Sequence, residues 1–292
     1  MGVKCCFKQM KAAFTSERKE KKMKKKLFVI GLLVLTMMFS ACSKSDSKSS
    51  SGSGESNSTG STIKSADDLK GKVIGVQLGT TGDIYAEDVE DAKIEKYNKG
   101  ADAIQALKQG KIDAVIIDRE PAKEFIKKND DLQILDVPFV EEEYSVAYKI
   151  GNDDLGKKLD DAIAALKNEG KLDEIVSHWI GESADQVSYV PDSSVTRTGK
   201  LVMATNAAFP PYELKEGDEV VGIDADMMRA VCDKLGLELE IEDMEFDSII
   251  AAVASGKVDV GVAGISVTDE RKKNVNFTVG YAKSTQVIIV RK

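Results

Sequence analysis

Three stretches of the sequence carry side chains that can bind a charged ligand. Arg271 presents a planar guanidinium, which can pair with a carboxylate through two hydrogen bonds. Asp118 follows an apolar, β-branched run, where a carboxylate is costly unless it meets a cation. Gly79-Thr-Thr-Gly82 precedes a helical pattern, so its backbone N–H groups and the hydroxyls of Thr80 and Thr81 can hold an anion. These residue types indicate binding by charge pairing.

Each of these residues also has a purely structural interpretation. Taken alone, the charged run that follows Glu270 favours a solvated surface arginine at position 271. Asp118 could cap the segment after it, and the two threonines could form an ordinary helix N-cap. His178 is the only histidine in the sequence, so a metal site has no second histidine, and no evident nucleophile lies beside it.

A weak internal repeat indicates which elements position these residues. Residues 104–118 align with residues 250–264, and each stretch predicts a helix, a terminating glycine and a buried strand. A strand pattern precedes each of them, at residues 71–77 and 199–205. Strand, helix and strand repeated twice predict an α/β fold of two lobes with mostly parallel sheets.

The ends of these strands are the expected place for a ligand. In open α/β sheets, ligands bind beside the carboxyl ends of the strands, where the strand order reverses. The segments at these ends are residues 77–83, 118–121, 206–212 and 264–271. The unusual residues of the sequence cluster there.

The remaining patterns predict the links between the lobes. Residues 144–150 and 281–291 predict two strands that pass from one lobe to the other. Residues 153–180 predict helices, with a break at Gly170. Residues 182–198 are polar and predict a connector.

Composition and charge exclude several classes of function. The chain has 292 residues, 42% hydrophobic and 31% charged, a globular composition that suits one large or two modest domains. Residues 1–41 hold ten basic and two acidic residues, so the rest of the chain is more acidic than the net charge of −8 indicates. An acidic body without a basic stripe argues against nucleic acid as a partner, because phosphate neutralisation supplies most of that affinity.

The cysteines provide neither a disulfide framework nor a metal site. Cys5 and Cys6 lie in the basic leader, Cys42 follows an apolar run, and only Cys232 belongs to the body. Cys232 lies in a helical pattern and is expected to be a buried thiol. We therefore expect no metal and no cofactor.

The leader is similar to a bacterial export signal. Three lysines precede an apolar stretch from Leu27 to Phe39, which fits a signal-peptide core and is short for a membrane span. Phe39-Ser-Ala-Cys42 resembles a lipobox, whose cysteine is lipidated and becomes the mature N-terminus, although Phe39 replaces the usual aliphatic residue. An uncleaved anchor is the alternative. Met23 is a more plausible start than Met1, which would leave residues 1–22 untranslated.

Four segments together resemble a known family. They are Val76-Gln-Leu-Gly-Thr-Thr-Gly82, Ala204-Thr-Asn-Ala-Ala-Phe-Pro-Pro-Tyr-Glu213, Gly222-Ile-Asp-Ala-Asp226 and Gly264-Ile-Ser-Val-Thr-Asp-Glu-Arg271. The second and fourth are quite specific in combination. The family is that of the solute-binding proteins of polar amino-acid ABC importers, the family 3 extracellular solute-binding proteins. The resemblance covers residues 63–292 and implies a two-lobed periplasmic-binding-protein type II fold.

The order of the lobes departs from this family. The family begins with the lobe that holds the Phe-Pro-Pro and Thr-Asp-Glu-Arg segments, whereas here the Gly-Thr-Thr lobe comes first. We interpret this order as a circular permutation joined through residues 182–198, which is tolerable where old termini lie close and the new cut is exposed. The permutation would leave the strand near Tyr144 as the sole covalent hinge. A domain-swapped or truncated gene product is the alternative.

The resemblance implies how the charged groups of a free amino acid would be bound. Arg271 would pair with the carboxylate, helped by Thr80 and Thr81. Asp118 would take the α-ammonium, together with the carbonyl of Gly264 and the hydroxyl of Ser266.

The resemblance also implies how the ligand side chain would be held. Phe209 and Phe246 would form two apolar walls, although taken alone Phe246 favours a core position. Asn206 and Gln77 would lie at positions that set side-chain selectivity. His178 and Trp179 resemble the closing helix of the family and are expected to pack.

The implied function is that of a binding protein, not an enzyme. It would be an extracytoplasmic lipoprotein, anchored to the cell membrane, that captures a free polar amino acid between its lobes and delivers it to the permease of an ABC importer. An enzyme on this fold, such as a dehydratase of a cyclic acid, would need a general acid, for which the sequence offers Asp118 and Glu213. A sensory lipoprotein, which binds an amino acid without feeding a transporter, is the other alternative.

The predicted domains follow from these patterns. They are the leader at 1–41, lipidated Cys42 with a flexible tether at 42–62, the Gly-Thr-Thr lobe at 63–143, an interlobe strand with helices that pack on the other lobe at 144–181, the connector at 182–198 and the Arg271-containing lobe at 199–292.

Overall fold

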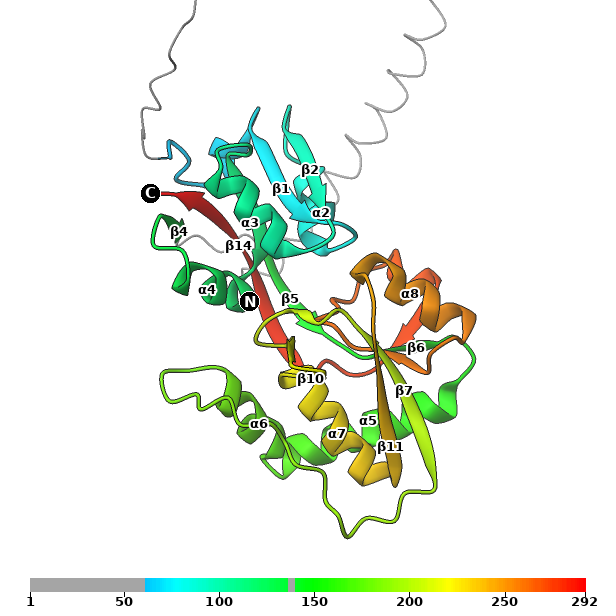
Figure 1. Ribbon diagram of the computed structural model, residues 1–292. Helices are drawn as coiled ribbons and strands as arrows, with labels where there is room; N and C mark the ends of the chain where they lie inside the picture. The colour runs from blue at the N-terminus through cyan, green and yellow to red at the C-terminus, as the bar shows by residue number, and fades with distance from the viewer. Residues whose placement is uncertain (1–60, 136–139) are drawn as a thin grey trace, which may run out of the picture. The chain divides into compact units, whose positions relative to one another are not determined.

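The computed structural model describes residues 61–135 and 140–292, which lie within one unit of the chain, Ser58–Lys292 (Figure 1). The predicted leader, the lipidation site at Cys42 and nearly all of the tether lie outside the described residues. Two large sheets divide the unit into a first lobe and a second lobe, named by their order along the chain.

The first lobe is built on a six-stranded sheet ordered β2-β1-β3-β14-β4, with β5 also paired to β14. Its strands are β1 (Val73–Gln77), β2 (Lys93–Tyr97), β3 (Ala114–Asp118), β4 (Leu132–Ile134), β5 (Val140–Tyr144) and β14 (Ala282–Arg291). β1 runs parallel to β2 and β3, whereas β14 runs antiparallel to β3, β4 and β5. β3 is buried along its whole length, as its unbroken apolar run predicts.

The second lobe is built on a five-stranded sheet ordered β11-β7-β12-β6-β13. Its strands are β6 (Ala147–Lys149), β7 (Gly199–Thr205), β11 (Leu237–Asp243), β12 (Val260–Gly261) and β13 (Val275–Phe277). β7 is parallel to β11 and β12, and β6 is antiparallel to β12 and β13. A small antiparallel sheet, formed by β8 (Ala208–Phe209), β9 (Glu213–Glu216) and β10 (Glu219–Val221), follows β7.

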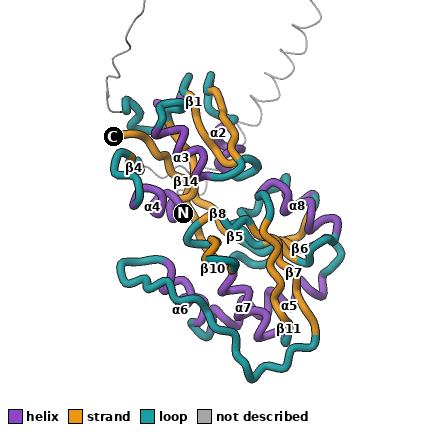
Figure 2. Tube along the Cα trace, in the orientation of Figure 1, coloured by secondary structure: helices purple, strands orange, loops and turns teal. Residues whose placement is uncertain are grey.

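Helices pack on these sheets and on one another (Figure 2). The first lobe has the 3₁₀ helix η1 (Ala66–Leu69) and the helices α2 (Thr81–Ala86), α3 (Gly100–Lys108) and α4 (Arg119–Lys127). The second lobe has α5 (Asp153–Asn168), α6 (Lys171–Trp179), α7 (Ile223–Leu235), α8 (Phe246–Ser255) and the 3₁₀ helix η2 (Arg271–Lys273). α2 and α3 contact β1, whereas α5 and α6 contact α7. In the described chain, no helix is both long and apolar enough to cross a membrane.

The α/β two-lobed fold predicted from the sequence is confirmed, but its sheets are mixed rather than mostly parallel. In each lobe three neighbouring strands are parallel, as the strand–helix–strand pattern requires. The antiparallel strands β6 and β14 are the ones that enter a lobe from the other lobe. They need no crossover helix, so nothing forces them to be parallel to their neighbours.

The chain passes between the lobes twice, between β5 and β6 and again between β13 and β14 (Figure 1). The two crossings are bonded to each other: Tyr281 N–H donates to Tyr144 O at 2.8 Å, and Thr278 N–H donates to Val146 O at 3.0 Å. The prediction of one covalent hinge near Tyr144 is therefore wrong. The second crossing carries β14 into the first sheet, although the range 199–292 was assigned to one lobe.

The internal repeat corresponds to matching structures in the two lobes. After α3 and Gly110, Asp113 Oδ2 accepts a 2.9 Å hydrogen bond from Val73 N–H of β1. After α8 and Gly256, Asp259 Oδ2 accepts a 2.8 Å hydrogen bond from Val202 N–H of β7. Each aspartate thus fixes the start of a buried strand beside its neighbour in the same way.

Cys232, His178 and Trp179 are placed away from the cavity described below. Cys232 is a buried free thiol of α7, and burial raises its pKa to about 12, so it is inert at neutral pH. Trp179 is buried and donates from Nε1 to Asp226 at 2.8 Å, as expected of a packing residue. His178 instead contacts the exposed Asp185 at 2.7 Å.

Candidate functional site

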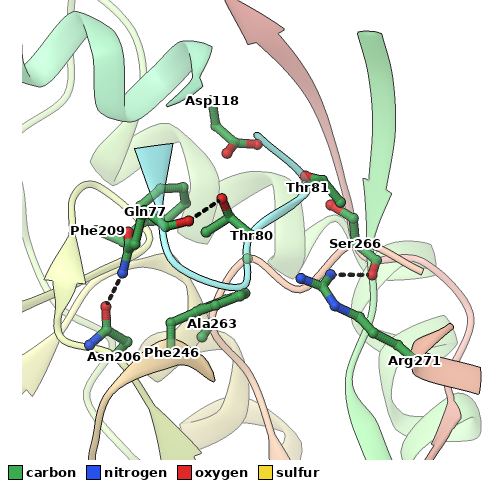
Figure 3. Close-up of a pocket in the computed structure, with 11 residues that line it drawn as sticks. Gln77, Thr80, Thr81, Asp118, Asn206, Phe209, Phe246, Ala263, Ser266 and Arg271 are labelled. Carbon is green, nitrogen blue, oxygen red and sulfur yellow. Dashed lines mark hydrogen bonds between the residues drawn. The ribbon is translucent and has the colours of Figure 1, made fainter. Parts of the chain in front are cut away.

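The structure brings all ten residues singled out in the sequence around one cavity (Figure 3). The lining adds one further residue, Ala263. The eleven lining residues are Gln77, Thr80, Thr81, Asp118, Asn206, Phe209, Phe246, Ala263, Gly264, Ser266 and Arg271. Most of them follow the carboxyl ends of the parallel strands β1, β3, β7 and β12, where the topology predicts a ligand site.

Arg271 is a buried cation in the wall of this cavity. It begins η2, is 8% exposed, and donates from Nη1 to Ser266 O at 2.6 Å and from Nη2 to Gly79 O at 2.9 Å. Its guanidinium carbon lies 5.4 Å from the centre of the Phe246 ring. Burial lowers the pKa of Arg271, and the negative charges of Glu142 and Asp118 partly oppose that effect. The guanidinium nevertheless stays charged.

Asp118 supplies the opposite charge at another side of the cavity (Figure 3). It is the last residue of β3, and its Oδ1 accepts hydrogen bonds from Ser284 Oγ at 2.7 Å and from Tyr144 OH. Burial raises the pKa of Asp118 to about 6; the Tyr144 hydrogen bond opposes this shift, and the Glu142 carboxylate adds to it. A nearby ligand cation would bring this pKa down again.

Three hydroxyl side chains also line the cavity. Thr80 is the N-cap of α2 and accepts from Asp83 N–H at 3.3 Å, so the N-cap interpretation is correct for it. Thr80 also donates to Gln77 O at 2.8 Å. Thr81 and Ser266 both donate to Glu142 Oε2, at 2.8 and 3.0 Å.

Phe209 and Phe246 form apolar parts of the lining. Phe209 is buried in the hydrophobic core and Phe246 is half-buried, and both also line the cavity. A Cβ atom at Gly264 would lie 3.0 Å from the Phe209 ring and 3.2 Å from the Tyr144 ring, which explains why glycine stands there.

Gln77 and Asn206 contact each other across the lobes. Gln77 Nε2 donates to Asn206 Oδ1 at 2.9 Å and to Asn98 O at 3.0 Å, and Asn206 Nδ2 donates to Met244 O at 2.8 Å. This network fixes both amides at the end of the cavity opposite Arg271 and Ser266 (Figure 3). A ligand side chain that reaches this end meets amides rather than a charge.

Sequence reasoning missed the residues that hold the lining in place. Glu142 accepts from Thr81 and Ser266, and Tyr144 and Ser284 hold Asp118. Asp224 Oδ2 accepts from Gly264 N–H at 2.8 Å and fixes the loop after β12. Their partners are far away in the sequence, so only the unusual concentration of acids at positions 141–143 could have drawn attention to Glu142.

Glu213, considered above as a general acid, does not line the cavity. It is fully buried, and burial, reinforced by the neighbouring Asp224 carboxylate, raises its pKa well above the usual value. Asp118 is therefore the only carboxyl group among the eleven lining residues.

Parts of the chain are similar to known proteins. Residues 201–292 match the family model described as bacterial extracellular solute-binding proteins, family 3. The arginine-binding extracellular protein ArtP of Bacillus subtilis is 42% identical over 93 residues, which are 32% of this chain and 36% of ArtP. The L-cystine-binding protein TcyJ of Escherichia coli K12 is 39% identical over 122 residues, which are 41% of this chain and 46% of TcyJ.

A solved structure of an ancestral arginine-binding protein bound to arginine is 45% identical, with a TM-score of 0.26 and coverage of 26% of this chain and 34% of that one. The matched stretches span less than half the length of these curated relatives. Both relatives are named as binding proteins. Residues 201–292 are thus similar to family 3 of the bacterial extracellular solute-binding proteins.

Proposed function

We propose that this protein captures a free polar amino acid between its two lobes outside the cytoplasm and delivers it to the permease of an ABC importer. The cavity suits a zwitterion with a polar side chain: a cation, a carboxyl group, hydroxyls, amides and two aromatic rings line one space. The relatives named as arginine- and cystine-binding proteins bind molecules of this class.

The observation that carries the proposal is the state of Arg271. Arg197 and Arg229 each pair with an aspartate, at Asp233 and Asp226, whereas Arg271 is buried and forms no ion pair with the carboxylates of the described residues. A buried cation that no carboxylate contacts directly is costly, and a ligand carboxylate would supply this direct partner. Asp118, on the same cavity, would balance the α-ammonium.

Binding would hold the lobes together. The first lobe contributes Thr80, Thr81 and Asp118, and the second lobe contributes Phe209, Ser266 and Arg271, among others. A ligand that needs both sets of contacts favours the closed arrangement. The two bonded crossings, with Tyr144 and Tyr281 at their edges, are the natural hinge.

We infer export, lipidation and circular permutation mainly from the sequence. The apolar run before Cys42 supports export and lipidation, so the two lobes would be tethered outside the membrane. Circular permutation is supported by the closeness of the two segments that it would have separated, because Ser61 N–H donates to Arg291 O at 3.4 Å. The exposed connector between α6 and β7 is then the new junction.

A thermal-shift screen tests the binding function. The purified protein would be heated with each of the twenty amino acids, cystine and ornithine at about 1 mM. A dissociation constant near 1 μM would stabilise the protein by about 4 kcal/mol and raise its melting temperature by roughly 8–16 °C. A rise confined to a few polar amino acids supports the proposal, and a flat panel with a folded protein contradicts it.

Two further measurements separate the alternatives. Co-purification with a permease from detergent-solubilised membranes distinguishes an importer component from a sensory lipoprotein. The dehydratase alternative is disfavoured because Glu213 lies outside the cavity lining, which leaves Asp118 alone to act as the acid. Turnover of a cyclic acid by the purified protein would support the dehydratase alternative.

A further inference from the structure

Glu142 is the acceptor at the centre of a hydrogen-bond network behind the cavity. It lies on β5, and its Oε2 accepts from Thr81 Oγ1 at 2.8 Å, from Ser266 Oγ at 3.0 Å and from Gln286 Nε2 at 3.0 Å. Its Oε1 accepts from Tyr85 OH at 3.0 Å. Thr81 belongs to the first lobe and Ser266 to the second, so one carboxylate joins a cavity residue from each.

These contacts fix the direction of the hydroxyl groups. An ionised carboxylate can only accept, and a hydroxyl has one proton to donate. Thr81 and Ser266 therefore give their protons to Glu142. Thr80 gives its proton to Gln77 O, at 2.8 Å. Toward the cavity, all three hydroxyls can offer only lone pairs.

Lone pairs suit one end of a zwitterion and not the other. They accept hydrogen bonds from an ammonium group, and they cannot donate to a carboxylate. Thr81 also accepts from Gln286 Nε2 at 3.2 Å, which leaves it one lone pair for the ligand, whereas Ser266 keeps two. The family resemblance implies that the threonine hydroxyls bind the carboxylate, whereas their hydrogen bonds here direct lone pairs toward the ammonium end.

We propose that Glu142 is a positioning residue that makes Thr81 and Ser266 acceptors for the α-ammonium of the ligand, beside Asp118. The inference rests on the proposed amino-acid binding. The ligand carboxylate is then left to Arg271 and to backbone N–H groups. Glu142 itself does not line the cavity, so it acts through the two hydroxyls.

The test compares an amino acid with the same molecule lacking its α-amino group. The probes are L-arginine and δ-guanidinovaleric acid; should L-glutamine bind the unmodified protein more tightly, they are L-glutamine and glutaramic acid. Calorimetry gives the dissociation constant of the des-amino analogue divided by that of the amino acid. This ratio measures what the ammonium contributes to binding. The variants are Glu142→Ala and the isosteric Glu142→Gln, with the exposed neighbour Glu141→Ala as the matched control.

Glu142→Ala should weaken binding of the amino acid and leave the des-amino analogue nearly unaffected, so the ratio should fall about tenfold to a hundredfold, the size of one hydrogen bond to a charged group. Glu142→Gln keeps an acceptor oxygen and should recover most of the ratio, and Glu141→Ala should leave it unchanged.

Two results would overturn the inference while leaving the proposed function intact: an equal loss for both probes in Glu142→Ala, or no recovery in Glu142→Gln. If the unmodified protein binds none of the amino acids in the thermal screen, the proposed function fails and the inference fails with it.

Discussion

The Nη2 atom of Arg271, in the second lobe, donates a hydrogen bond of 2.9 Å to the carbonyl oxygen of Gly79, in the first lobe. The same side chain holds Ser266 O within its own lobe, at 2.6 Å. Arg271 therefore touches both halves of the cavity. It can couple binding of an anion to the closing of the lobes.

Replacing Arg271 by Ala should abolish measurable binding. A buried ion pair that loses its cation costs about 2–5 kcal/mol or more, which corresponds to a loss of about 30-fold in affinity or greater. Calorimetry with the amino acid found in the thermal screen measures this change. The exposed Lys272→Ala is the control for the loss of one positive charge in the same turn. Unchanged affinity in Arg271→Ala would remove Arg271 from the site.

Affinity should depend on pH through Asp118. The pKa of this carboxyl group is about 6 without ligand, and an ammonium partner stabilises only the ionised form, so binding lowers the pKa and releases a proton. Affinity should thus be constant above about pH 7 and fall roughly tenfold by pH 5, since Asp118 must lose its proton before it can pair with the ammonium.

Asp118→Asn is the control for this pH dependence. This variant should bind the amino acid weakly, because the counter-charge for the ammonium is lost. Its affinity should not vary over the same pH range. Asp224 also has a pKa of about 6, raised by burial, so a pH dependence that survives in Asp118→Asn would assign the effect to Asp224 instead.

Asp113 and Asp259, which occupy matching positions in the two halves of the repeat, should contribute equally to stability. Asp113 Oδ2 accepts from Val73 N–H at 2.9 Å, and Asp259 Oδ2 accepts from Val202 N–H at 2.8 Å. Substitution of either aspartate by alanine leaves that N–H without its acceptor. Each change should lower the free energy of unfolding by about 1.5–3 kcal/mol in urea titration. Lys111→Ala, at an exposed neighbouring position, should change it by less than about 0.5 kcal/mol.

A reordered chain should keep the binding activity if the lobes are permuted. The chain would run from 199–292 through a short Gly-Ser link into 61–181, which is feasible because Ser61 and Arg291 are hydrogen-bonded neighbours. We expect the same amino acid to bind with a dissociation constant within about threefold, since no cavity residue is removed. A folded reordered chain that binds nothing would mean that the observed order is needed for closure.

The sequence predicted the parts of the fold that depend on neighbours along the chain. The repeat around Asp113 and Asp259 gave the helix, the terminating glycine and the buried strand in both lobes, because periodicity and capping are local properties. The type of sheet was predicted less well. Strands such as β14 join by pairing with distant partners, and nothing in their own residues states the direction of the pairing.

Ten of the lining residues could be named in advance, because strand ends and motifs can be recognised in the sequence. The topology then places these residues at one edge of each sheet. Glu142 could not be named in advance. Its partners Thr81 and Ser266 lie 61 and 124 positions away, and their hydroxyls are directed toward it only once the two lobes have assembled. The sequence by itself thus determined which side chains line the cavity. The tertiary structure alone decided where their protons point, because hydrogen-bond direction depends on partners that folding brings within 3 Å of each other.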